Sequence, residues 1–358
     1  MNRKVLFSLL TTMIILGILL SACQPAPIEE TPVAEAPVQE APATEEPETE
    51  APAAEAPAEE AIKVALVLSG PISDASWNAA AYNALLSLKD MFNLEIEYTE
   101  NTDLPDIEPT YRGYADSGFD VIIGHGFQFS DPAFEVAPAY PETHWGIVMG
   151  YAEGDNIESM NFKEEETSYL AGFVAASMSE TGVIGGVGGM DIPSIIKMME
   201  AYKLGAKSVN PDIEVLVTYV GVWDDPTAGY EATLAQINQN ADVVFTSANL
   251  TSVGVYQAAE EKGVFAIGSE GDQCGAATDT VLATITDNFD KVMELMIRSV
   301  QEGNFNGGVN FYGLKEGAIS YFACEGMLPA DVESEAENLK QQIIDGSLVV
   351  PTILEISD

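Results

Sequence analysis

Tryptophan, carboxylate and amide side chains follow several of the strands that the sequence predicts. Trp77 comes after an apolar strand at 63–68 and a polar turn, and Trp223 closely follows a strand at 214–220. Two opposed aromatic faces can hold a planar ring, and nearby carboxylates accept hydrogen bonds from hydroxyl or ring N–H groups. We therefore expect a binding site for a flat small molecule, formed by these residues: Asp74, Trp77, Asn78, Phe127, Asp131, Trp223, Asn249, Glu270 and Asp272.

Each of these residues also has a structural explanation that needs no ligand. Either tryptophan can pack at the edge of a lobe. Asp74 and Asp131 lie near expected helix starts, where aspartate commonly caps the first turn. His125 stands between two glycines at a strand end and is a further residue that can line the site. The residue types alone leave both explanations open.

The elements that would position these side chains alternate between strands and helices. Four strands are expected within 63–149 with helical segments between them, and the alternation begins again at 182. Such alternation is typical of βαβ units, in which helices cover both faces of a parallel sheet. Two successive sets predict an α/β protein with two similar lobes. Ligands of such sheets bind at the carboxyl ends of the strands, so we expect the site in the cleft between the lobes.

The two lobes are expected to share the chain in alternating segments. The N-terminal lobe takes 61–160 and about 285–312, and the C-terminal lobe takes 161–284 and about 313–358. Because each lobe contributes one aromatic face, we expect a bound ligand to close the hinge between them.

The first 60 residues have a different composition. Residues 1–22 combine early basic charges with an apolar run and small residues, which predicts a signal peptide. The run ends in Ser-Ala-Cys, which resembles the lipobox of bacterial lipoproteins and implies lipidation of Cys23; an ordinary signal peptide with a chance cysteine is the alternative. Residues 23–60 are rich in Pro, Ala and Glu, which predicts an extended acidic linker that does not fold.

Charge and cysteine content limit the partners and the compartment. The chain carries a formal net charge of −43, which excludes nucleic acid and anionic lipid surfaces as partners because phosphate binding needs Lys and Arg. Cys274 and Cys324 are the cysteines of the folded region. A disulfide between them is expected in an oxidising compartment, and two buried thiols are the alternative.

The sequence offers little for catalysis. Its two histidines, His125 and His144, lack metal-ligand partners at helical spacing. No Gly-x-Ser-x-Gly elbow is present, and the glycine-rich stretch at 183–189 lacks the lysine of a phosphate loop. We therefore expect neither enzymatic activity nor a metal or other cofactor.

Five segments of the chain resemble the motifs of one family, in the same order. They read Ser73-Asp74-Ala75-Ser76-Trp77-Asn78, Phe162 to Gly172 (FKEEETSYLAG), Gly185 to Pro193 (GGVGGMDIP), Trp223-Asp224-Asp225-Pro226 and Glu270-Gly271-Asp272-Gln273. From residue 62 to about 325 the chain resembles the basic membrane protein family, the substrate-binding lipoproteins of ABC transporters that include the purine nucleoside receptors. The resemblance implies the two-lobed periplasmic-binding-protein type I fold.

The resemblance also implies roles for individual residues. Trp77 and Trp223 match aromatics, usually Phe, that stack on the two faces of a base. Asp131 and Glu270 match acids, usually Asp at the second position, that hold ribose hydroxyls. Asp287 stands where the family has a lysine that contacts ribose, and this charge reversal keeps nucleobases and other planar heterocycles as alternatives.

The expected function is therefore capture of a purine nucleoside or related heterocycle outside the cell. The protein would be a monomer, tethered to the membrane by lipid on Cys23, that delivers its ligand to ABC permease subunits. A sensor that presents its ligand to a membrane kinase, and an extracytoplasmic nucleoside hydrolase, are the alternatives.

Overall fold

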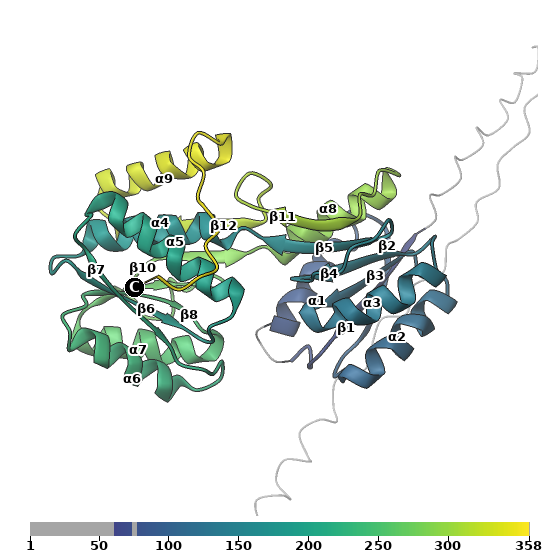
Figure 1. The fold of residues 1–358 in the computed structure, drawn as a ribbon, viewed down its shortest axis with the longest axis horizontal. Helices are drawn as coiled ribbons and strands as arrows, with labels where there is room; N and C mark the ends of the chain where they lie inside the picture. Colours follow the sequence, from purple (N-terminus) through teal and green to yellow (C-terminus); the bar gives the residue numbers. More distant parts are fainter. Residues whose placement is uncertain (1–60, 74–76, 358) are drawn as a thin grey trace, which may run out of the picture. The chain divides into compact units, whose positions relative to one another are not determined.

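The computed structural model describes residues 61–73 and 77–357. The signal peptide, Cys23, the linker and Asp74 therefore lie outside the described residues. Each of the two sheets of the folded region has six strands, and the chain passes between the sheets three times (Figure 1).

The first sheet is entirely parallel, in the order β11-β5-β4-β3-β1-β2. Its strands are β1 (Ile62–Leu68), β2 (Leu94–Thr99), β3 (Val121–His125), β4 (His144–Val148), β5 (Ile157–Phe162) and β11 (Gly308–Tyr312). Its helices are α1 (Trp77–Ser87), α2 (Leu104–Asp116), α3 (Ser130–Val136) and α8 (Phe289–Gln301), with short 3-10 turns η1 (Phe127–Phe129) and η2 (Ala137–Ala139).

Alternation of apolar side chains along β1 explains why helices cover both faces of this sheet. Val64 and Leu66 pack in the cluster that includes residues of α1 and α8, whereas Ala65 and Val67 pack in the cluster that includes residues of α2 and α3. Successive residues of a strand point to opposite faces, so a strand that is apolar throughout must be buried on both sides.

The second sheet has the order β12-β10-β9-β8-β6-β7, in which β12 alone is antiparallel to its neighbour. Its strands are β6 (Val183–Gly188), β7 (Glu214–Tyr219), β8 (Val243–Ser247), β9 (Phe265–Gly268), β10 (Val281–Asp287) and β12 (Ile319–Ala323). Its helices are α4 (Glu164–Met178), α5 (Pro193–Val209), α6 (Pro226–Ile237), α7 (Ser252–Lys262) and α9 (Ala330–Asp345), with the 3-10 turn η3 (Asn249–Thr251). Helices α4, α5 and α9 lie on one face and α6 and α7 on the other (Figure 1).

Two glycines bring α4 and α5 into backbone contact. A Cβ atom on Gly172 would lie 2.0 Å from the Tyr202 carbonyl oxygen, and one on Gly205 would lie 1.9 Å from the Tyr169 carbonyl oxygen. No other residue leaves this space, so these positions fix how closely the two helices pack. The close packing places the start of α5 beside the start of α4.

The chain leaves and re-enters the first sheet at three short connections: Lys163 between β5 and α4, Asn288 between β10 and α8, and 313–318 between β11 and β12. The expected lobe boundaries after 160 and 284 fall inside β5 and β10. The α/β class with two helix-flanked sheets agrees with the sequence prediction. Strands β5, β10, β11 and β12 and helices α8 and α9 were not part of that prediction.

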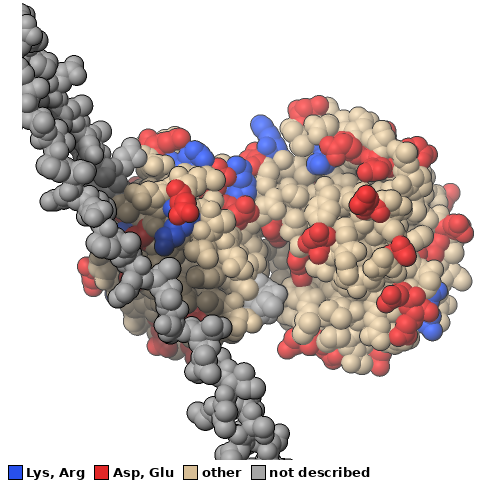
Figure 2. Space-filling model, turned by 180° about the vertical axis from the view of Figure 1, so that it is seen from behind, with Lys and Arg blue, Asp and Glu red and all other residues tan. Residues whose placement is uncertain are grey.

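Acidic side chains outnumber basic ones on the surface in view in Figure 2. Figure 2 shows Asp and Glu scattered over the face in view, with Lys and Arg in few places. The distribution agrees with the net charge of −43. Within 61–73 and 77–357, no helix is long and apolar enough to cross a bilayer.

Candidate functional site

Trp77 lies in a cluster of rings at the carboxyl edge of the first sheet. As the first residue of α1, its indole stacks on the imidazole of His125, with ring centroids 4.0 Å apart and an interplanar angle of 28°. Phe289, the first residue of α8, packs edge-on against both rings at 5.2 and 5.0 Å. The ring of Phe162, at the end of β5, lies 5.6 Å from Phe289. Residues at two of the three connections between the sheets thus hold Trp77 in place.

The other expected residues of this lobe have different surroundings. Asn78 is buried, and its Oδ1 accepts a hydrogen bond from the Gly70 amide at 3.2 Å, which holds the turn after β1. Asp131 lies in the first turn of α3 and accepts a hydrogen bond from the Tyr151 hydroxyl at 2.9 Å. The Phe127 side chain is 67% exposed, so it contributes little to the core and is available for contact.

Trp223 is fixed by the turn that begins α6. Asp225 is the N-cap of that helix and accepts hydrogen bonds from the Thr227 and Ala228 amides, and Pro226 takes the first helical position. The half-buried indole lies against Gly189, where an added Cβ atom would come within 2.3 Å of the ring. The Trp-Asp-Asp-Pro segment is therefore a helix start that presents an aromatic side chain.

Asn249 and Glu270 meet at the carboxyl ends of neighbouring strands β8 and β9. With its amide oriented to donate, Asn249 forms hydrogen bonds to both carboxylate oxygens of Glu270, at 3.0 and 2.8 Å. Ser247 donates to Glu270 Oε1 at 3.5 Å. Both Asn249 and Glu270 have positive φ angles, of 47° and 64°, conformations that asparagine tolerates better than most residues. The pair presents a carboxylate that can accept hydrogen bonds from hydroxyl groups.

The electrostatics of Glu270 favour proton exchange near neutral pH. The residue retains exposed surface, but enough protein surrounds its carboxyl group to reduce hydration, and this desolvation raises the pKa to about 7. Hydrogen bonds from the Asn249 backbone amide and the Ser247 hydroxyl oppose the shift. A ligand that donates hydrogen bonds would favour the ionised form.

Asp272 stabilises the loop that carries Glu270. Its carboxylate accepts a hydrogen bond from the Cys274 amide at 3.0 Å, and the side chain is exposed. Cys274 forms a disulfide with Cys324, which lies just after β12, with Cα atoms 5.4 Å apart. Thr284 donates to the Gly271 carbonyl at 2.7 Å. The disulfide and this hydrogen bond tie the Glu270 loop to two neighbouring segments.

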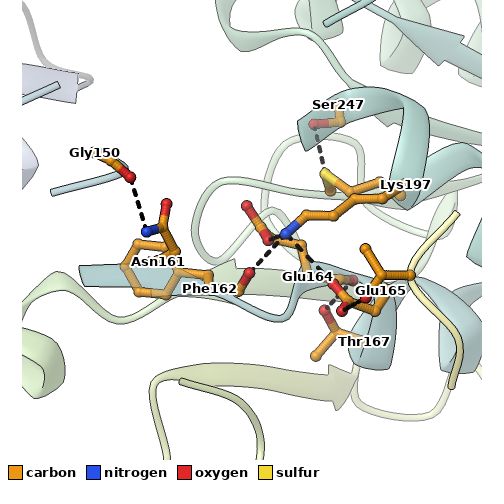
Figure 3. Close-up of polar contacts among 10 residues, drawn as sticks. Gly150, Asn161, Phe162, Glu164, Glu165, Thr167, Lys197 and Ser247 are labelled. Atoms are coloured by element: carbon orange, nitrogen blue, oxygen red, sulfur yellow. Dashed lines mark hydrogen bonds and ion pairs between the residues drawn. The ribbon is translucent and has the colours of Figure 1, made fainter. Parts of the chain in front are cut away.

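A buried lysine was missed by the sequence analysis. Lys197, in the second turn of α5, forms ion pairs with Glu164 and, at 3.4 Å, with Glu165, and donates to the Phe162 carbonyl at 2.7 Å (Figure 3). Burial raises the pKa of Glu164 although Lys197 opposes the shift. The pKa of Lys197 is also raised, since the two carboxylates outweigh its own desolvation. The sequence feature that could have predicted a buried cation here is the pair of adjacent glutamates, Glu164 and Glu165, at the start of a largely buried helix.

Asp287 is close enough to this cluster for the charges to interact. It is the last residue of β10, two residues before Phe289. Burial, followed by the charge of Glu164, raises its pKa well above the usual range, and Lys197 opposes the shift. The acidic residue at the expected ribose-contacting position therefore lies beside the connection between β10 and α8.

Two cavities lie away from these residues. The larger, of about 560 Å³, is at the amino ends of β4 and β5, near His144 and Asn156. The smaller, of about 310 Å³, lies beside β5, β11 and α8. Among the residues that the structure describes, no group of three or more His, Cys, Asp or Glu side chains is arranged to hold a metal ion.

Two helix-flanked sheets joined by three short connections, with aromatic and carboxylate side chains at strand ends in both, define a two-lobed solute-binding protein. A family profile described as ABC transporter substrate-binding protein PnrA-like matches residues 61–353. The chain belongs to this family, which confirms the resemblance found in the sequence, and it has the periplasmic-binding-protein type I fold.

Individual relatives support the same assignment. Basic membrane protein A of Borreliella burgdorferi is 30% identical over 302 residues, which cover 81% of this chain and 88% of the relative. A purine-binding protein of Brucella abortus is 30% identical over 290 residues, which cover 80% and 82%. The crystal structure of an ABC transporter solute-binding protein from Aeropyrum pernix superposes on this chain with a TM-score of 0.68 at 26% identity. The match covers 82% of this chain and 94% of the Aeropyrum chain.

Proposed function

We propose that this protein is a lipid-anchored extracytoplasmic receptor of an ABC importer that binds a purine nucleoside or a related planar heterocycle between its two lobes. The observation that carries the proposal is the placement of Trp77 at the carboxyl edge of one sheet and of Trp223, Asn249 and Glu270 at the carboxyl edge of the other. Flat rings bind well to aromatic faces, and a carboxylate with free acceptor capacity binds hydroxyls.

The two lobes contribute different interactions in this proposal. The indole of Trp77 is rigid because His125 covers one of its faces, so stacking on it costs little side-chain entropy. Glu270 is held by Asn249 and would accept hydrogen bonds from the sugar or from the ring edge. A ligand that contacts both lobes has a higher affinity for the closed state than for the open state. Binding therefore shifts the equilibrium between the two states toward the closed one.

Asp287 determines which member of this ligand class is favoured. The carboxyl group of Asp287 offers oxygen acceptors and no positive charge, so it suits ring or exocyclic N–H donors at least as well as ribose. A free nucleobase is therefore the second candidate. Tethering through Cys23 and the 23–60 linker would keep either receptor near the permease.

The decisive experiment is mass spectrometry of the small molecule that co-purifies with the protein, followed by calorimetric titration with adenosine, guanosine, adenine and glucose. Saturable binding of a purine compound supports the proposal. Binding of glucose alone, or recovery of a chemically altered nucleoside after incubation, would overturn it.

The contribution of Trp77 can be measured separately. Trp77→Ala should weaken binding of the identified planar ligand by about 1–3 kcal/mol, the range for stacking of an aromatic side chain on a base. Phe134→Ala, which removes an aromatic side chain that is 39% exposed on α3, is the matched control and should leave affinity unchanged. Equal affinities for both variants and the wild type would exclude Trp77 from the site.

A further inference from the structure

The cavity of about 310 Å³ lies where two of the connections between the sheets meet. Its wall is formed by residues of β5, β11, the second half of α8 and the segments that follow α8 and β11: Glu158, Leu295, Ser299, Asn304, Asn306, Asn310, Phe311, Tyr312 and Glu316. The Tyr312 carbonyl at the end of β11 accepts a hydrogen bond from the Lys163 amide at 2.9 Å, which joins the two connections directly. The volume is at the lower limit for small-molecule sites, which restricts any ligand to a few heavy atoms.

A buried carboxylate forms part of the cavity wall. Glu158 is 3% exposed, and its Oε1 accepts hydrogen bonds from the Tyr312 hydroxyl and, at 3.0 Å, from Asn310 Nδ2. Among the described residues, no hydrogen bond reaches its second oxygen, Oε2, and this oxygen is not enclosed by protein atoms. Glu158 lines the cavity, and Oε2 is the oxygen of its carboxylate that has free acceptor capacity.

No positive charge compensates Glu158. Of the residues that line the cavity, none is Lys, Arg or His, and Glu316 adds a second carboxylate. Lys197 lies 5.9 Å from the centroid of the Phe311 ring, but its ammonium is already paired with Glu164 and Glu165. Burial raises the pKa of Glu158, and its two neutral donors only partly offset this effect. A buried carboxylate without a cation is unfavourable, and a bound cation would remove much of that cost.

We propose that this cavity binds a small organic cation with a primary ammonium group, which donates a hydrogen bond to Glu158 Oε2. An ammonium group has three donors, and the amide oxygens of the lining asparagines and the Ser299 hydroxyl supply further acceptors. Leu295 offers apolar surface to the carbon chain. This site is separate from the proposed heterocycle site and does not depend on it.

Calorimetric titration of the whole protein with n-butylammonium chloride at pH 7 tests the proposal. We expect saturable binding that falls at least tenfold in Glu158→Gln and severalfold in Ser299→Ala, which removes one of the lining acceptors. Glu260→Gln, an exposed change on α7 with the same effect on net charge, is the matched control and should bind as the wild type does. Tetramethylammonium, which has the charge but no N–H donor, should bind at least tenfold more weakly than butylammonium.

Specific and nonspecific cation binding give different outcomes. Because ionised Glu158 is the form that attracts the ammonium, affinity should fall in the wild type as the pH is lowered below 7, and this fall should be absent in Glu158→Gln. Non-saturable heat, equal affinity for tetramethylammonium, or equal loss in Glu158→Gln and Glu260→Gln would overturn the proposal, since each reports attraction to the acidic surface as a whole. Failure of purine binding would leave this result unaffected.

Discussion

Removal of the buried ammonium of Lys197 provides a quantitative test of how the connection between β5 and α4 is held. The side chains of Lys197, Glu164 and Glu165 are 8%, 4% and 6% exposed, so none of the three can recover hydration without a change in structure. Lys197→Met keeps the length and apolar stem of the side chain and removes the charge. The Phe162 carbonyl and the Glu164 and Glu165 carboxylates then lose the ammonium, and Glu165 keeps its hydrogen bond from the Thr352 hydroxyl.

The expected loss in the free energy of unfolding is about 3–5 kcal/mol at pH 7, the range for a buried ion pair from which one partner is removed. A surface ion pair would contribute only about 0–1 kcal/mol, so the two cases are easily separated. Lys207→Met, in the last turn of the same helix and exposed, is the matched control and should change stability by less than about 0.5 kcal/mol.

The pH dependence of the loss identifies its cause. Without Lys197, the folded-state pKa of Glu164 rises further above its unfolded value, so the folded protein binds the proton more tightly than the unfolded chain does. Stability of the variant relative to the wild type should therefore increase as the pH falls through that raised pKa toward the unfolded value of about 4.3.

Urea denaturation followed by circular dichroism at several pH values measures both effects. A loss below 1 kcal/mol at pH 7 would refute the reasoning, because it would mean that water or another group solvates the two carboxylates. A large loss that does not change with pH would point to altered packing of α4 against α5 and not to uncompensated charge.

Two further predictions concern the loop that carries Glu270. Replacing Cys274 and Cys324 together by serine should lower the free energy of unfolding by about 2–4 kcal/mol, since the disulfide closes a long loop of the unfolded chain. The same change should weaken ligand binding, and a reducing agent should affect only the wild type. Unchanged stability and affinity in the double variant would contradict this prediction. If only ionised Glu270, with its pKa of about 7, accepts hydrogen bonds from ligand hydroxyls, affinity should rise about tenfold from pH 6 to pH 8. Calorimetry should find this rise in the wild type and not in Glu270→Gln, and a flat wild-type profile would disprove it.

Much of the architecture follows from local properties of the sequence. Apolar runs such as 63–68 predict strands buried on both faces, and turn residues after each run mark where the strands end. Because these signals come from neighbouring residues, the strands expected in the two sets of βαβ units match β1 to β4 and β6 to β9 to within a few residues. Strands β5, β10, β11 and β12 were not predicted. The same logic located Trp77, Trp223 and Glu270 at carboxyl ends of strands, since a parallel sheet brings those ends to one edge.

Residue type could not predict which of the loop side chains would remain available to a ligand. Asn78 and Asp272 each accept a hydrogen bond from a backbone amide, whereas Asn249 and Glu270 pair with each other, and the binding roles of all four stay predictions. Asparagine and aspartate can serve either purpose, and the outcome depends on which amide lies within about 3 Å of the side chain.

The sequence by itself determined the α/β class, the two sets of βαβ units and the family. Tertiary structure decided which distant residues meet: Lys197 with the Phe162 carbonyl, Cys274 with Cys324, and Glu158 with Asn310 and Tyr312. The physical reason is that periodicity records only whether a side chain is buried. A buried charge is tolerated only beside specific partners, and the positions of those partners are set by how the helices and strands pack.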